Sequence, residues 1–283
     1  ARLAFNLSAD YERIQGEGTR TTALAGVNYT INSTLAVGVF GRHVKASGQS
    51  NTGFFFQLNW TPGRNRLVRG TYDTARREVD LNYRYSPQPY VGTTAYELGL
   101  RRSGEIDTAE LSGRVAHVSN RFEVTAQHNI LSTSNFDSDE RVQISRATLA
   151  SSLVLAGGKL SFSRPVREAF AIVSRHSTLA RKQILIDRTE NGVRAQSDGF
   201  GPAVIPDLPT YIRTSAYVDV EDLPPGYDMG SGQFGFKAPL YAGYSLEAGS
   251  AASVSIMGSV VNKEGKPLGF IAGELQRKDR PGD

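Results

Sequence analysis

The feature that most constrains this chain is the strict alternation of apolar and polar residues within consecutive strand-length segments. From Leu3 to Tyr11 the odd positions are apolar, while Asn6, Ser8 and Asp10 lie between them. A period of two places successive side chains on opposite faces of a β-strand. Such a segment therefore predicts a strand with one apolar face and one wet face.

The same pattern recurs through the first 160 or so residues. It is strong in residues 22–31, 35–39, 54–60, 79–85, 96–101, 110–115 and 122–130, and weaker in 142–149, 153–156 and 160–163. We expect about eleven or twelve strands joined by hairpins, most of them close to the roughly 9–11 residues that cross a bilayer obliquely.

Two features favour a membrane barrel over a soluble sandwich. The apolar faces end in aromatic residues, as in the girdle of a transmembrane barrel, at Tyr11, Tyr29, Trp60 and Tyr85. The opposite faces are charged, at Arg42, Arg84, Glu97, Arg101, Glu110, Arg114 and Glu123. A soluble sandwich also has a wet face, but its crossovers usually interrupt such a long series of hairpins. No run of 18 apolar residues occurs, which excludes a transmembrane helix.

The pattern changes after Arg164-Pro165, where proline becomes frequent and the alternating segments shorten. Short strands are expected in residues 169–173, 183–187, 203–205, 215–220, 244–248 and 253–260. Short runs separated by turn residues are typical of small β-sandwich modules. The predicted fold class is all-β: antiparallel transmembrane strands of a partial barrel, followed by a small Ig-like β-sandwich.

The sequence contains fragments of catalytic and cofactor-binding motifs, but the residues around them do not fit those motifs. Gly230, Gly232 and Gly235 spell the dinucleotide fingerprint, but no helix pattern follows them. The four histidines lack metal-ligand spacing, and the chain has no Cys. His128 and the Ser- and Asp-rich segment after it are explained by ordinary strand and turn chemistry. We therefore predict no enzyme activity, no catalytic residues, no cofactor and no metal.

Nucleic acid is also disfavoured as a partner. The net charge is +4, but basic and acidic residues are interspersed along the chain. A nucleic-acid-binding surface needs basic residues clustered on one face or stripe.

Five ordered motifs after residue 157 carry a family resemblance. They are the strand that begins with Gly157-Gly158, the entry S-x-P-V…F-A-I-V from Ser163, the signature S-D-x-x-G-x-A-x-x-P-x-L-x-x-Y beginning at Ser197, the step D-x-x-x-L-P from Asp219, and the turn G-K-P-L-x-F from Gly265. In this order they resemble the C-terminal half of a fimbrial outer-membrane usher of the chaperone–usher pathway. The positions that match the family's motifs are Pro165, Asp198, Gly201, Pro206, Leu208, Tyr211, Leu223, Pro224, Gly265 and Pro267.

The chain also departs from the family pattern. Tyr211 is followed by Ile212-Arg213-Thr214, where the signature usually continues with Arg-x-Asn, and Ile271 replaces a glycine. These departures indicate a divergent branch. Gly201, Pro206 and Pro224 are best interpreted as residues that form turns or limit pairing at edge strands, and not as residues that contact a partner protein.

The resemblance implies three regions: the C-terminal half of an usher barrel in residues 1–163, a periplasmic β-sandwich in 164–249, and the start of a second, truncated sandwich in 250–283. It implies an outer-membrane protein that assembles and secretes pilus subunits. Its partners would be periplasmic chaperone–subunit complexes, pilin subunits and outer-membrane lipid. The alternatives are a porin-like passive barrel with an appended domain, and a soluble β-sandwich adhesin.

Overall fold

The computed structural model describes residues 1–14, 18–46, 49–133, 141–179, 182–223, 229, 232–249 and 261–267. Across these residues the regular structure is β, apart from one 3-10 turn at Ser177–Leu179. None of them forms a helix long and apolar enough to cross a membrane. The all-β fold class is therefore confirmed.

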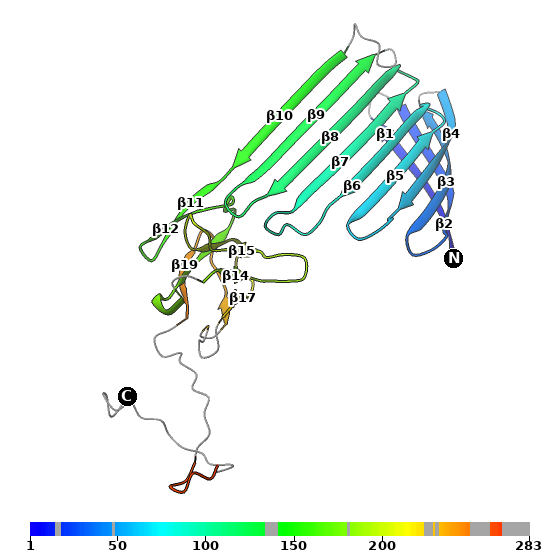
Figure 1. The fold of residues 1–283 in the computed structure, drawn as a ribbon. Helices are drawn as coiled ribbons and strands as arrows, with labels where there is room; N and C mark the ends of the chain where they lie inside the picture. The colour runs from blue at the N-terminus through cyan, green and yellow to red at the C-terminus, as the bar shows by residue number, and fades with distance from the viewer. Residues whose placement is uncertain are drawn as a thin grey trace.

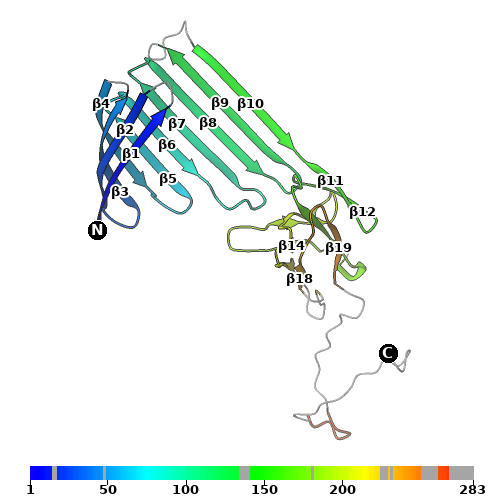
Figure 2. The same ribbon diagram turned by 180° about the vertical axis from the view of Figure 1, so that it is seen from behind.

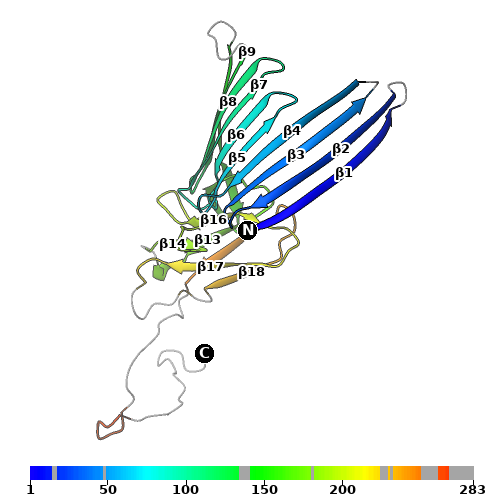
Figure 3. The same cartoon turned by 90° about the vertical axis from the view of Figure 1, so that its right-hand side faces the viewer.

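Ten strands form one antiparallel sheet, which we call the large sheet (Figure 1). They are β1 (Arg2–Ile14), β2 (Gly18–Thr30), β3 (Leu35–Ala46), β4 (Gln49–Trp60), β5 (Arg66–Asp73), β6 (Glu78–Tyr85), β7 (Thr94–Ser103), β8 (Thr108–Val118), β9 (Glu123–Thr133) and β10 (Arg141–Ala150). Their order in the sheet is their order in the chain. The sheet bends into an open trough (Figure 3), as expected of part of a barrel.

The register carries the alternation across the sheet without interruption. One row of directly opposed residues contains Tyr85, Tyr96, Val115, Ala126 and Ala147, on what we call the apolar face. The adjacent row, on the polar face, contains Arg84, Glu97, Arg114, Gln127 and Arg146. Each strand therefore presents the same two surfaces as its neighbours.

Strand β5 was not among the segments predicted from alternation. Its apolar-face series is Val68, Gly70 and Tyr72, which a glycine interrupts, and Leu67 lies on the polar face. Gly70 is almost filled by its neighbours, because a Cβ there would lie 3.1 Å from Leu81 Cδ2. The strand is present because its backbone pairs on both sides, with β4 and β6.

The first half of strand β10 inverts the pattern of the other strands, while Arg146, Ala147 and Leu149 keep it. Its register places Val142 and Ile144 on the polar face beside Leu131, while Gln143 and Ser145 lie on the apolar face. This explains why the alternation in residues 142–149 is weak in the sequence. The end of the polar face nearest β10 is consequently less polar than the rest.

Strands β11 (Ser152–Ala156) and β12 (Lys159–Ser163) form a two-stranded sheet of their own, which we call the hairpin. The sequence pattern had placed them among the barrel strands. The turn between them contains Gly157 and Gly158, both at positive φ (55° and 73°), a conformation that glycine adopts readily. Val154 and Ala156 on its inner face pack against the module that follows.

That module, the sandwich, is built from β13 (Ala169–Arg175), β14 (Ile184–Ile186), β15 (Ala195–Gln196), β16 (Ala203–Leu208), β17 (Thr214–Val220), β18 (Gln233–Phe236) and β19 (Gly243–Ala248). One sheet has the order β16-β13-β19 and the other β15-β14-β17-β18. The core lies between them and includes the fully buried Ile184, Ile186 and Ile205. Strands β15 and β18 were not predicted, since they are two and four residues long. The predicted strand at residues 253–260 lies outside the described residues.

On the polar face of the large sheet, the ring of Phe40 occupies the space above two glycines, Gly26 and Gly38. A Cβ on Gly26 would lie 2.1 Å from Phe40 Cδ1, and one on Gly38 would lie 2.8 Å from Phe40 Cε2. The ring also meets Phe55, with centroids 6.1 Å apart. The absence of side chains at Gly26 and Gly38 is what lets this ring lie against the backbone.

We predict that Gly26→Ala destabilises the large sheet by about 1–3 kcal/mol, because the new methyl group displaces the Phe40 ring. Urea unfolding in detergent micelles measures the change. Gly113→Ala is the matched control, since its Cβ would lie 3.7 Å from Leu98 Cδ2, an ordinary contact. Combining Gly26→Ala with Phe40→Ala should cost less than the two single losses added together. Equal losses for Gly26→Ala and Gly113→Ala would contradict the prediction.

Candidate functional site at the junction of sheet and sandwich

The sandwich is attached to one end of the large sheet along a continuous line of contacts, which we call the junction (Figures 1 and 2). On the side of the sheet it consists of the loop at 86–93, between β6 and β7, and the turn at 119–122, between β8 and β9. On the side of the sandwich it consists of residues 191–202, which precede and follow the edge strand β15.

Arg121 is the central residue of the junction. Its side chain is 10% exposed, and it pairs with Asp198 through an Nη2–Oδ1 distance of 2.6 Å and an Nε–Oδ2 distance of 2.9 Å. Such a two-point guanidinium–carboxylate pair fixes orientation as well as distance.

The same guanidinium reaches the hairpin and the loop before β16. Nη1 donates to Ser161 Oγ at 3.0 Å and to the carbonyl oxygens of Phe162 and Pro202 at 2.6 Å and 3.1 Å. Nη2 donates to the carbonyl oxygen of Gly201 at 3.0 Å. One side chain on a turn of the large sheet therefore holds both the hairpin and the sandwich.

Asp198 accepts hydrogen bonds from both sides of the junction. Asn120 Nδ2 donates to its Oδ2 at 2.6 Å, and the backbone N–H of Phe200 donates to Oδ1 at 2.9 Å. Burial raises the pKa of this carboxyl, but the hydrogen bonds from Arg121, Asn120 and Phe200 outweigh burial and hold the pKa below its ordinary value. The carboxylate is thus ionised at neutral pH and matched to the buried guanidinium.

A second arginine, Arg164, joins the loop at 86–93 of the large sheet to the segment before β15 of the sandwich. Arg164 Nη1 donates to the carbonyl of Pro89 at 3.1 Å, and its Nη2 donates to that of Arg194 at 2.7 Å. Burial lowers the pKa of Arg164. Nearby, the Val91 N–H donates to the Val193 carbonyl at 2.9 Å, which joins sheet and sandwich by backbone alone.

The residues predicted from the family motifs fall in three places. Asp198 and Gly201 meet at Arg121, and they bond each other across a tight turn, with N–O distances of 3.1 Å and 3.2 Å. Pro165 is partly buried beside Arg164.

The second group belongs to the sandwich core. Pro206 lies in β16, an edge strand, where the pairing with β13 shifts register between Ala169 and Ala171. Proline is tolerated at edges and bulges because its missing N–H costs no ladder bond there. Leu208 is fully buried and Leu223 packs against the same core.

The third group is away from the junction. Tyr211 is 67% exposed and has a positive φ of 60°. Gly265 has φ of 80° in a turn whose ends are bridged by Val261 and Pro267. Pro224 lies outside the described residues.

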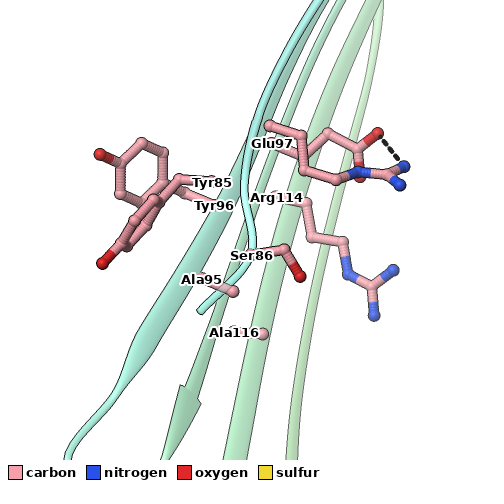
Figure 4. A pocket seen from close by; sticks show the side chains of 8 residues that line it. Tyr85, Ser86, Ala95, Tyr96, Glu97, Arg114 and Ala116 are labelled. Atoms are coloured by element: carbon pink, nitrogen blue, oxygen red, sulfur yellow. Dashed lines mark hydrogen bonds and ion pairs between the residues drawn. The ribbon is translucent and has the colours of Figure 1, made fainter. Parts of the chain in front are cut away.

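The polar face of the large sheet carries a ladder of ion pairs. Arg42 pairs with Asp73 at 3.0 Å, Arg101 with Glu78 at 3.1 Å, and Arg84 with Glu97 at 2.8 Å. Figure 4 shows Glu97 and Arg114 on one side of the strands and Tyr85 and Tyr96 on the other. The pocket drawn there holds about 340 Å³. Arg84 and Glu97 neutralise each other there, and Arg114 adds a positive charge, so the pocket has the character of a polar surface.

Sequence reasoning missed Arg121 and Asn120. Both lie in a turn whose residues show no motif, and their side-chain hydrogen bonds reach residues 40 to 81 positions away. Among the described residues, no group of three His, Cys, Asp or Glu side chains is placed to hold a metal ion.

The fold resembles that of one solved pilus-assembly structure. Compared with a chain of the E. coli P pilus tip assembly intermediate PapC-PapD-PapK-PapG, it gives a TM-score of 0.57 at 14% identity. The match covers 95% of this chain and 34% of that chain, so the chain spans about a third of its neighbour's length. The Bacillus anthracis TIE protein gives a TM-score of 0.19 at 12% identity, over 77% of this chain and 37% of that one. This TM-score is too low to indicate a shared fold. No family model and no curated protein matches.

We predict that Arg121→Met loosens the sandwich from the large sheet, at a cost of about 2–3 kcal/mol, because it removes the buried guanidinium and leaves the partly buried Asp198 without its cation. Arg188→Met is the matched control, since Arg188 and its partner Asp219 are 53% and 43% exposed and such pairs contribute about 0–1 kcal/mol. Urea unfolding followed by protease cleavage within residues 164–249 measures both. Similar effects of the two substitutions would show that Arg121 does not hold the junction.

Acid should weaken the junction through Asp198. Its folded pKa is depressed, so its contribution is complete above the unfolded pKa of about 3.9 and is lost as pH falls through the lower folded pKa. We expect the stability difference between the native chain and Asp198→Asn to be constant from about pH 7 to 5 and to shrink as pH falls below about 4. A difference that does not decrease at all below about pH 4 would contradict this assignment.

Proposed function

We propose that this chain is the C-terminal half of an outer-membrane usher, which assembles chaperone-delivered pilus subunits into a fibre and secretes it across the outer membrane. The large sheet would form part of the pore wall, with its apolar face toward lipid and its polar face toward the lumen. The sandwich would lie in the periplasm beneath that wall.

The observation that carries the proposal is the junction. A sandwich held to the end of a membrane sheet by Arg121 and Arg164 is fixed in position relative to the pore. Fixed positioning is what a protein needs if it works by holding two partners in the right geometry. The likeness in fold to a chain of a pilus tip assembly complex supports the same assignment.

The chemistry proposed for the partners is β-strand addition. A pilus subunit lacks one strand, the chaperone donates it temporarily, and the next subunit's extension replaces it. Main-chain hydrogen bonds supply the affinity in such an exchange, and pockets for alternate side chains supply the specificity. Around its ion pairs, the mixed positive and negative charges of the polar face would give a hydrated wall without an apolar patch that could retain a passing subunit. No cofactor is required.

A porin-like barrel remains the second candidate, because a polar wall with ion pairs suits any aqueous pore. It gives no role to the sandwich or to the buried arginines that hold it. A soluble adhesin leaves the exposed apolar face of the large sheet without a function, since residues such as Leu98 and Leu149 are 54% and 71% exposed.

The test is to uncouple the sandwich without removing it. We expect Arg121→Met in the full-length protein to reduce surface fibres strongly, while the protein still reaches the outer membrane and keeps its heat-modifiable mobility on gels. Deletion of residues 164–283 should abolish fibres and also preserve insertion. Arg188→Met should leave fibre number unchanged.

Fibres are counted by electron microscopy and by surface immunolabelling. Normal fibre assembly after deletion of residues 164–283 would rule out a role of the sandwich in subunit handling. Loss of small-solute uptake without any effect on fibres would favour the porin.

A further inference from the structure

The hairpin β11–β12 carries an apolar surface that no described residue covers. Its inner face is buried against the sandwich, through Val154 and Ala156. Its outer face consists of Leu153, Leu155, Leu160 and Phe162, which are 60%, 64%, 60% and 53% exposed. Four large apolar side chains on one face of a two-stranded sheet form a contiguous patch, and such patches on folded proteins mark interaction sites.

The place of this patch is fixed by the junction. Arg121 bonds Ser161 and Phe162 of β12, and Ser151 Oγ donates to the carbonyl oxygens of Arg121 and Ser163 at 2.9 Å and 3.1 Å. Figures 1 and 2 show β11 continuing the line of β10 below the large sheet. The hairpin therefore lies directly at the end of β8, β9 and β10.

At that end of the large sheet, aromatic and aliphatic side chains alternate on the apolar face. Tyr29, Trp60, Tyr85 and Tyr96 lie near the ends of β2, β4, β6 and β7, and Leu3, Val37 and Val68 lie opposite them on β1, β3 and β5. Across β8, β9 and β10 the apolar face continues with Val115, Ala126 and Ala147, and Phe122, which is 38% exposed, directly precedes β9. The outer face of the hairpin adds four large apolar side chains beyond the end of β10.

We propose that the hairpin is a membrane anchor: its outer face inserts into the periplasmic leaflet of the outer membrane and continues the apolar face of the large sheet below β10. The spacing supports this, because Leu149 on the apolar face of β10 is followed at even intervals by Leu153 and Leu155, with only Ser151 between the two strands. The inference rests on the proposed membrane location. It adds that the sandwich is held at the bilayer surface by lipid as well as by Arg121.

Depth measurements with single nitroxide labels test this. The 283 residues contain no Cys, so Leu155→Cys and Phe162→Cys each introduce one label site in this chain. Leu98→Cys, in the middle of the apolar face, is the lipid reference. Tyr217→Cys is the water reference, because it is 58% exposed on β17, in the sheet of the sandwich that does not contact the hairpin. The full-length protein is reconstituted in vesicles of phosphatidylethanolamine and phosphatidylglycerol.

We expect the ratio of oxygen to nickel-complex accessibility at positions 155 and 162 to be several-fold higher than at 217 and to approach that at 98. If positions 155 and 162 match 217, the hairpin faces water and the inference is overturned. If both reagents are excluded from 155 and 162, another part of the protein covers the patch, and the inference is equally overturned. A label at 98 that is itself in water would instead overturn the proposed membrane sheet, so the two failures are distinguishable.

Discussion

The structure of the large sheet depends on one constraint: every strand pairs with its neighbours in an unbroken register. Within the described residues, none of its nine strand pairs contains a register shift. Because side chains alternate with a period of two, a slip of one residue would move a whole strand's apolar side chains to the other face. Unbroken pairing is therefore what keeps an apolar and a polar surface separate over ten strands.

This constraint also explains which parts of the fold the sequence could predict. Strands with intact alternation, such as β1 and β9, were predictable because the pattern itself reports the two environments. Strand β5 was not, since Gly70 removes one side chain from its apolar series and the neighbouring Leu81 fills the space. Strand β10 was located but not oriented, because Val142 and Ile144 face the side that is polar elsewhere. The hairpin was predicted as two strands of the barrel series; in the structure its strands pair only with each other, and its inner face packs against the sandwich.

The junction marks the limit of prediction from local pattern. Asp198 and Gly201 were identified through a motif, but their common partner, Arg121, lies in an ordinary turn 77 residues away from Asp198. Nothing local distinguishes that arginine from the exposed arginines of the polar face. Its buried environment exists only after the sheet, hairpin and sandwich have come together, so its role is a tertiary property.

The order of the strands has a consequence for how the chain reaches this structure. Every pairing in the large sheet joins segments that are adjacent in sequence, so each hairpin can form without waiting for a distant partner, and local pairing of this kind is associated with fast folding. The clamp at Arg121 is different, because it closes only when residues up to Pro202 are in place. We infer a sequence in which the wall grows one hairpin at a time and the contacts of Arg121 form after the wall, once residues up to Pro202 have folded.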